Sequence, residues 1–224
     1  MVCLLFLCGP VFAAGTEFAR APGFSYAGPA AAKGVLVWVP GTYGRDQTGP
    51  PDPPDFVSRE AAAGMDVWCF NRDRGDDPLD RGAATLAREV QGLRDLGYRR
   101  VIIAGHSRGA WIALTTLAHP GLADAVVAFD PAAHGRRDDR KARAMADWTA
   151  LWDAAVNNGT RVVLVQLLDD PWDPDPARRL AIARARLGAN LLSIFQPAAP
   201  TGHAGVYEPA FDEHFGTEIV AFLR

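Results

Sequence analysis

The motif Gly-His-Ser-Arg-Gly at residues 105–109 constrains the fold of this chain more than any other feature of its sequence. Residues 101–104 before it are a short, apolar and largely β-branched run, which is typical of a buried strand. After it, apolar residues recur at helical spacing from Trp111 to Leu117. The motif therefore predicts a strand that turns sharply into a helix. Glycines on both sides of Ser107 suit such a turn, because a side chain at either position would collide with the adjoining strand or helix.

Ser107 occupies the centre of this predicted turn, at the positive end of the helix that follows. A G-x-S-x-G pattern between a strand and a helix is the nucleophile elbow. A serine hydroxyl is a poor nucleophile at neutral pH, and it needs a histidine to accept its proton and a carboxylate to orient that histidine. The elbow therefore predicts an acid and a histidine further along the chain, each just after a strand.

Apolar runs of strand length alternate with helical patterns along nearly the whole chain. The predicted strands are residues 34–40, 65–70, 101–104, 124–129, 160–168 and 190–195. The predicted helices are residues 56–64, 79–96, 176–187 and 210–223, together with the elbow helix and one that ends near residue 156. This alternation predicts an α/β fold, a mostly parallel twisted sheet with helices on both faces. A further edge strand is expected at residues 24–26, and Leu96 is expected on the apolar face of the helix 79–96.

Several aspartates follow the predicted strand 160–168, and three of them are candidates for the acid. Asp170 is preferred, because Pro171 holds it in an extended conformation just past the strand. Asp173 and Asp169 stay open as alternatives. Asp175 precedes the first residue of a predicted helix, which is the position of a capping residue.

His203 follows the predicted strand 190–195 in a loop with glycine on both sides, and it is the predicted base. His214 falls within the last predicted helix, where a histidine at the surface or at the edge of the core is the ordinary expectation. His106 is expected to pack and to form hydrogen bonds, and His119 and His134 are expected to be structural or exposed.

Ser107 in G-x-S-x-G, the acid after the next strand but one and the Gly-His loop before the last helix together resemble the α/β-hydrolase superfamily. The resemblance covers residues 35–224 and is closest to small dienelactone-hydrolase-like and carboxylesterase-like members. It implies the α/β-hydrolase fold with a minimal lid, for which the polar segment 134–143 is the available place. Members commonly carry the acid four residues before a proline, as Asp170 stands to Pro174. Dienelactone hydrolases carry cysteine in place of Ser107, so their substrate is not transferred to this chain.

The resemblance also implies an oxyanion hole made of two backbone N–H groups. One belongs to Arg108, the residue after the nucleophile. The other is assigned to Thr42, with Tyr43 as the alternative, although Pro40 stands where many relatives have histidine. The predicted activity is that of a serine hydrolase that cleaves a carboxylic ester or a related acyl bond through an acyl-enzyme. A peptidase or acyltransferase on the same fold, and a non-catalytic binding protein, are the alternatives.

Composition narrows the range of partners. The net charge of −3 means that the chain lacks the excess of positive charge that nucleic-acid binding requires. A small acyl or ester compound is therefore the expected partner. No G-x-G-x-x-G follows the first predicted strand and no P-loop is present, so no cofactor is expected. The acidic stretch 169–175 lacks the glycine and the distal glutamate of an EF-hand loop, so no metal is expected either. Trp148, Trp152 and Trp172 are candidates for the wall of an acyl pocket.

The first 14 residues are predicted to be a secretory signal peptide, with residues 15–224 as a single domain. Their apolar run is too short to span a bilayer. Export to the periplasm or the medium is therefore expected, and a cytoplasmic location if the run is not a signal. Without the leader, Cys69 is the one remaining cysteine, and a buried structural thiol is expected there.

Overall fold

The computed structural model describes residues 17–43, 50–72, 78–135, 138–156 and 159–224. Within these ranges, seven strands form one sheet in the order β1-β3-β2-β4-β5-β6-β7. The strands are β1 (Glu17–Arg20), β2 (Gly34–Val39), β3 (Met65–Asn71), β4 (Val101–His106), β5 (Ala125–Phe129), β6 (Arg161–Gln166) and β7 (Leu191–Phe195). All pairings are parallel except that of β1 with β3. The predicted signal peptide lies outside the described residues.

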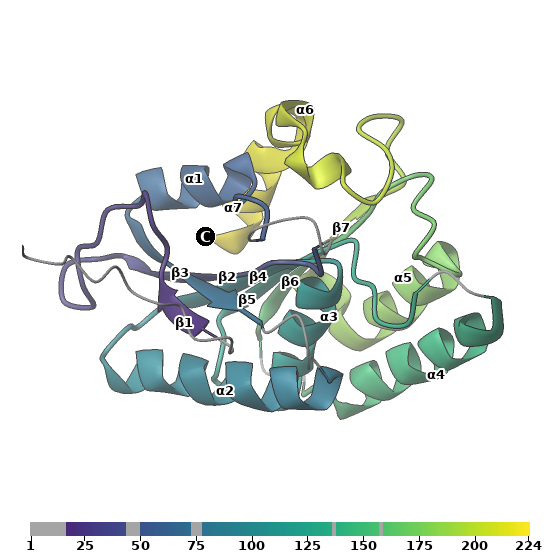
Figure 1. Cartoon of the computed structure of the whole chain (residues 1–224), viewed down its shortest axis with the longest axis horizontal. Helices are drawn as coiled ribbons and strands as arrows, with labels where there is room; N and C mark the ends of the chain where they lie inside the picture. The colour runs from purple at the N-terminus through teal and green to yellow at the C-terminus, as the bar shows by residue number, and fades with distance from the viewer. Residues whose placement is uncertain (1–16, 44–49, 73–77, 136–137, 157–158) are drawn as a thin grey trace, which may run out of the picture.

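Helices cover both faces of the sheet (Figure 1). One face carries α1 (Asp55–Ala62) and α7 (Thr217–Leu223), which continues from α6 (Pro209–Phe211) through a π-helical turn. The other carries α2 (Leu79–Asp95), α3 (Arg108–Thr115), α4 (Asp138–Ala154) and α5 (Pro176–Leu187). The predicted α/β architecture is confirmed. In the described part of the chain, no helix is long and apolar enough to cross a membrane.

The central strands are continuous apolar runs because helices bury them from both sides. Every residue of β2, β4 and β5 is buried. On α2, Leu86, Val90 and Leu93 are buried as predicted, but Leu96 is 59% exposed, so that part of the prediction was wrong. The helix ends at Asp95, and the chain leaves it through Gly97, whose φ of +106° is easy only for glycine. Leu96 therefore no longer lies on the buried stripe.

The edge strand is β1, and the expectation of a strand at residues 24–26 was wrong. Phe18 of β1 stacks on Trp68 of β3, with ring centroids 5.1 Å apart. The chain after residue 26 is held by a side chain instead of a strand ladder. The backbone N–H groups of Ala27 and Gly28 donate to the carboxylate of Asp66 at 2.8 and 2.9 Å.

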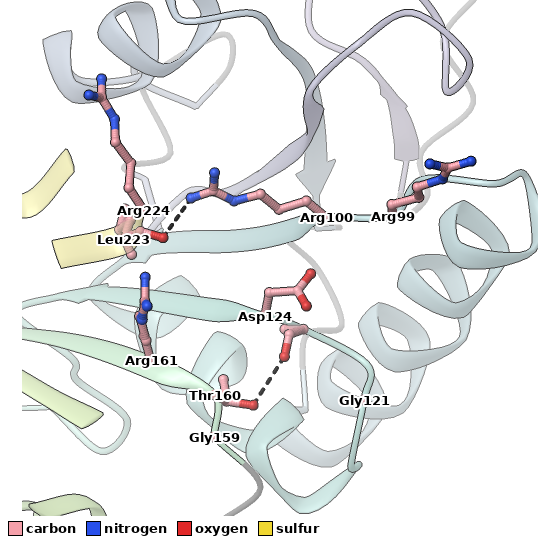
Figure 2. A pocket seen from close by; sticks show the side chains of 10 residues that line it. Arg99, Arg100, Gly121, Asp124, Gly159, Thr160, Arg161, Leu223 and Arg224 are labelled. Atoms are coloured by element: carbon pink, nitrogen blue, oxygen red, sulfur yellow. Dashed lines mark hydrogen bonds between the residues drawn. The ribbon is translucent and has the colours of Figure 1, made fainter. Parts of the chain in front are cut away.

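Arginines at the amino ends of the strands lie against the end of the last helix (Figure 2). Arg100, just before β4, donates to the carbonyl oxygen of Leu223 at 2.6 Å. Arg161, at the start of β6, donates to that of Phe222 at 3.1 Å. Both carbonyl groups belong to the last turn of α7. Positive charge is favourable there, because the last carbonyls of a helix have no partner within the helix. The 480 Å³ cavity beside them is therefore bordered by groups that stabilise α7.

Candidate active site

Ser107 lies between β4 and α3 in a backbone conformation that L-residues rarely adopt, with φ 55° and ψ −122°. Hydrogen bonds to neighbouring backbone hold Ser107 in this strained conformation. Its N–H donates to the carbonyl oxygen of Phe129 at 2.9 Å, and its carbonyl oxygen accepts from the N–H of Trp111 at 3.1 Å. The flanking glycines are required by space. A Cβ at Gly109 would lie 2.0 Å from the carbonyl oxygen of Val39, and one at Gly105 would lie 2.7 Å from the backbone of Gly109. The predicted strand-turn-helix geometry is confirmed.

The structure brings Ser107, His203 and Asp170 together from three loops at one edge of the sheet. Nε2 of His203 lies 2.8 Å from Oγ of Ser107, and Nδ1 lies 3.0 Å from the Asp170 carboxylate. A carboxylate only accepts hydrogen bonds, so Nδ1 carries the proton and Nε2 is left to accept from the serine hydroxyl. The Asp170 side chain is only 3% exposed and that of His203 18%. The three side chains therefore form a connected relay from the buried carboxylate to the serine.

The other aspartates of the same loop are engaged elsewhere. Asp173 forms a buried ion pair with Arg179 at 2.9 Å and accepts from Nε2 of Gln166 at 2.7 Å. Asp169 adopts a φ of +62° in the turn that precedes Asp170. Asp175 caps α5 as predicted, accepting from the N–H of Arg178 at 3.1 Å. Of the three candidate acids, Asp170 is the one that contacts His203.

The remaining histidines lie apart from the relay or beside it. His214 is exposed in the π-helical turn before α7, where its Nδ1 is 3.4 Å from the carbonyl oxygen of Ala199. His134 is paired with Asp147 at 2.7 Å at the cavity wall, and burial lowers its pKa. His106 is buried against His203.

A cavity of about 460 Å³ opens beside Ser107. Its walls include Trp172, whose ring centroid lies 5.6 Å from that of His203, and Arg140 from the first turns of α4. The segment 134–143 thus lies partly at the cavity, where His134, Gly135 and Arg140 line it, while residues 136 and 137 are outside the described ranges.

Of the three tryptophans considered for the pocket wall, Trp172 lines the cavity and two do not. Trp148 and Trp152 of α4 are buried in the core, where the ring of Trp148 lies 5.4 Å from that of Trp111 in α3. The indole N–H of Trp148 donates to the carbonyl of Arg179 at 3.0 Å, and the Arg179 guanidinium lies 3.9 Å from its ring. Both rings lie on the buried side of α4, whereas Trp172 follows β6 and lines the cavity.

Thr42 and Arg108, the residues predicted to supply the oxyanion hole, both line this cavity, and so does Tyr43. The loop after β2 runs directly against the nucleophile, because a Cβ at Gly41 would lie 3.1 Å from Cβ of Ser107. Arg72 holds that loop by donating to the carbonyl of Pro40 at 2.7 Å.

Sequence reasoning missed three buried polar residues around the site, namely Arg72, Asp130 and Arg179. Asp130 follows β5 at the same sheet edge and accepts from the N–H of Leu167 at 2.8 Å. Burial raises its pKa, and the nearby charges of Asp170 and Asp173 add to the shift. Arg72 and Asp130 could have been found from the sequence, because each directly follows a strand, β3 or β5. Nothing in the helical pattern of α5 singles out Arg179.

Two further findings concern metal binding and thiol chemistry. In the ranges that the structure covers, no three or more His, Cys, Asp and Glu side chains cluster to hold a metal ion. Cys69 is buried in β3, and burial raises the pKa of its thiol to about 12.

A parallel sheet covered on both faces, with a strained serine at the β4–α3 turn and an acid and a histidine after β6 and β7, defines the α/β-hydrolase fold, and this chain has it. A Pyrococcus furiosus esterase superposes with a TM-score of 0.63 at 15% identity, covering 86% of this chain and 81% of that one. A Klebsiella pneumoniae protein assigned as a dienelactone hydrolase gives 0.59 at 16% identity, with 93% and 91% covered. Brefeldin A esterase, a bacterial homologue of human hormone-sensitive lipase, gives 0.56 at 18% identity, with 98% and 80% covered. The sequence matches no protein-family model and no curated protein sequence.

Proposed function

We propose that the protein is a serine hydrolase that cleaves a carboxylic ester or a related acyl bond. The relay of Ser107, His203 and Asp170 carries this proposal, with its contacts of 2.8 and 3.0 Å beside an open cavity. Similar structures that are described as esterases support it. A cavity of about 460 Å³ favours a short acyl group, with Trp172 as part of its wall.

The first half of the reaction forms an acyl-enzyme. Oγ of Ser107 attacks the substrate carbonyl carbon while Nε2 of His203 takes the hydroxyl proton, and Asp170 stabilises the imidazolium that results. The backbone N–H groups of Arg108 and Thr42 donate to the oxyanion of the tetrahedral intermediate. The bond from carbon to the leaving oxygen then breaks, and His203 gives its proton to the departing alcohol.

Water completes the cycle. His203 removes a proton from the water as its oxygen attacks the acyl carbon, and the same oxyanion site holds the second intermediate. The bond to Oγ breaks, the proton returns to Oγ, and the carboxylic acid leaves. No cofactor enters any of these steps. We further propose that residues 1–14 direct export and that residues 15–224 form one domain.

Covalent labelling tests the proposal. Purified protein is treated with a fluorophosphonate probe and analysed by intact and peptide mass spectrometry, followed by assays with short-chain aryl esters. We expect one adduct per chain on Ser107, and loss of both labelling and hydrolysis in Ser107→Ala and His203→Ala. His214→Ala is the matched control, because His214 is an exposed histidine outside the relay, and it should label like the wild type. A folded wild-type protein that forms no adduct would contradict the proposal.

A further inference from the structure

His106 is the last residue of β4 and directly precedes the nucleophile, yet the proposed reaction does not use it. Its side chain is buried, with 7% of the residue exposed. Nε2 of His106 lies 2.6 Å from the backbone carbonyl oxygen of His203. Because a carbonyl only accepts, Nε2 carries the proton and donates it. The residue before the nucleophile thus holds the backbone of the proposed base, 97 residues away in the chain.

The imidazole of His106 also packs directly against the base. Its ring centroid lies 4.8 Å from that of His203, with the planes tilted by 47°. On another side it meets the ring of Tyr207 at 5.0 Å, edge to face. Tyr207 belongs to the short 3-10 helix that follows the base loop. The ring therefore contacts the base and the helix after the base loop, besides forming the hydrogen bond.

The third neighbour of His106 is the loop that carries Thr42. A Cβ at Gly41 would lie only 3.0 Å from Nδ1 of His106, which shows how closely this loop approaches the ring. The same ring therefore borders the base loop, the nucleophile and the loop with the proposed second oxyanion donor.

The ring is uncharged at neutral pH. Burial, and after it the nearby charge of His203, lower the pKa of His106 to about 4, against smaller opposing effects of the hydrogen bond and Asp170. An uncharged ring matters here, because a second positive charge 4.8 Å away would oppose the imidazolium that forms on His203 during the reaction.

We propose that His106 is a positioning residue, whose N–H holds the backbone of His203 so that Nε2 of His203 stays within hydrogen-bonding distance of Ser107. The base lies in a loop between Gly202 and Gly205, and the N–H of Gly202 donates to the carbonyl oxygen of Leu168 at 2.7 Å. The hydrogen bond from His106, at the buried end of a strand, holds the backbone at His203 itself. A displacement of about 1 Å in a reacting group is expected to cost about a hundredfold in rate. This inference rests on the proposed hydrolase function and assigns one more residue to it.

Three variants test the hydrogen bond. His106→Phe keeps a ring of similar shape and removes the donor. His106→Gln restores a donor, since its Nε2 is the same number of bonds from the backbone as Nε2 of histidine. Tyr98→Phe is the matched control: it removes another buried hydrogen bond, the one of 2.5 Å from the Tyr98 hydroxyl to Asp66, and this bond lies at the amino ends of β4 and β3, away from the site.

Ester hydrolysis is measured for each variant, with kcat normalised to the sites that a fluorophosphonate titrates. We expect His106→Phe to lower kcat by about ten- to a hundredfold with KM within about threefold of wild type. His106→Gln should recover kcat to within about threefold, and Tyr98→Phe should match the wild type. If His106→Phe does not fold, His106→Asn, whose amide ends one bond short of the carbonyl, takes its place with the same expected loss.

The outcomes separate this inference from the proposed function. A wild type that hydrolyses esters, beside a His106→Phe variant with unchanged kcat, overturns the role of His106 and leaves the function intact. Equal losses in the Gln and Phe variants overturn the hydrogen bond as the cause. A folded wild type that neither labels nor hydrolyses overturns the function, and the role of His106 with it.

Discussion

Nη1 of Arg179 lies 2.9 Å from Oδ1 of Asp173, and both side chains are almost completely buried. Gln166 donates to the second oxygen of the same carboxylate. Asp173 is therefore held inside the protein by two partners, whereas Asp170, three residues earlier, is the carboxylate that contacts Nδ1 of His203. Two aspartates in one short loop thus have different surroundings, and their substitutions should have different effects.

Replacing each of these aspartates with asparagine should separate activity from stability. Asp170→Asn removes the charge that selects the tautomer of His203, and we expect kcat to fall on the order of 10³- to 10⁴-fold with little loss of stability. Asp173→Asn breaks a buried ion pair and should cost about 3 kcal/mol of unfolding free energy while the folded fraction keeps its kcat. Ester hydrolysis and urea unfolding measure the two effects. The reverse pattern would make Asp173 the acid.

The N–H group of Thr42, and not its side chain, is the proposed oxyanion donor. Thr42→Pro deletes that N–H and should lower kcat by about 10²- to 10³-fold. Thr42→Val keeps the N–H and should leave kcat within a few-fold of the wild type. Steady-state hydrolysis by both variants, with circular dichroism to confirm folding, checks this. If Thr42→Pro keeps its kcat and Tyr43→Pro lowers kcat instead, the oxyanion donor is the N–H of Tyr43.

The sequence predicted strands β2 to β7 and the helices between them, because buried parallel strands read as continuous apolar runs. It singled out Ser107 and His203 because each follows such a run, and the structure brings these two side chains into contact. It was insufficient where the outcome depends on contacts distant in the chain. Proline spacing favoured Asp170, but what separates it from Asp173 is the packing of α5, which places Arg179 beside Asp173. The place of β1 depends likewise on the contact of Phe18 with Trp68, about 50 residues away by chain order.

The buried carboxyl of Asp130 should make stability depend on pH. Its pKa is raised by burial, so the folded protein keeps this proton at pH values where the unfolded chain has already released it. The stability that this group contributes therefore falls as the pH rises from 3.8, the ordinary pKa of an aspartate, toward the raised pKa of Asp130. Asp130→Asn keeps an oxygen for the N–H of Leu167, removes the titration, and suits the positive φ of 45° at this position.

We expect the unfolding free energy of Asp130→Asn, relative to wild type, to increase as pH rises from about 4. Urea unfolding at a series of pH values measures the difference. Asp95→Asn, on the exposed end of α2, is the control and should give a curve parallel to that of the wild type. Parallel curves for Asp130→Asn as well would show that this carboxyl does not hold its proton in the folded state.

The same substitution should have opposite effects at two helical glycines. At Gly109 in the elbow, a Cβ would overlap the carbonyl oxygens of Val39 and Pro40, at 2.0 and 2.5 Å, and both belong to backbone that cannot give way easily. Gly109→Ala should therefore cost about 3 kcal/mol or more and abolish hydrolysis. At Gly92 on the exposed side of α2, nothing lies within 4 Å of a Cβ, so Gly92→Ala should stabilise the protein by about 0.5–1 kcal/mol and leave kcat unchanged. Urea unfolding measures the change in stability of both variants, and ester assays measure their kcat. A stable, active Gly109→Ala would contradict the close packing of the elbow against the end of β2.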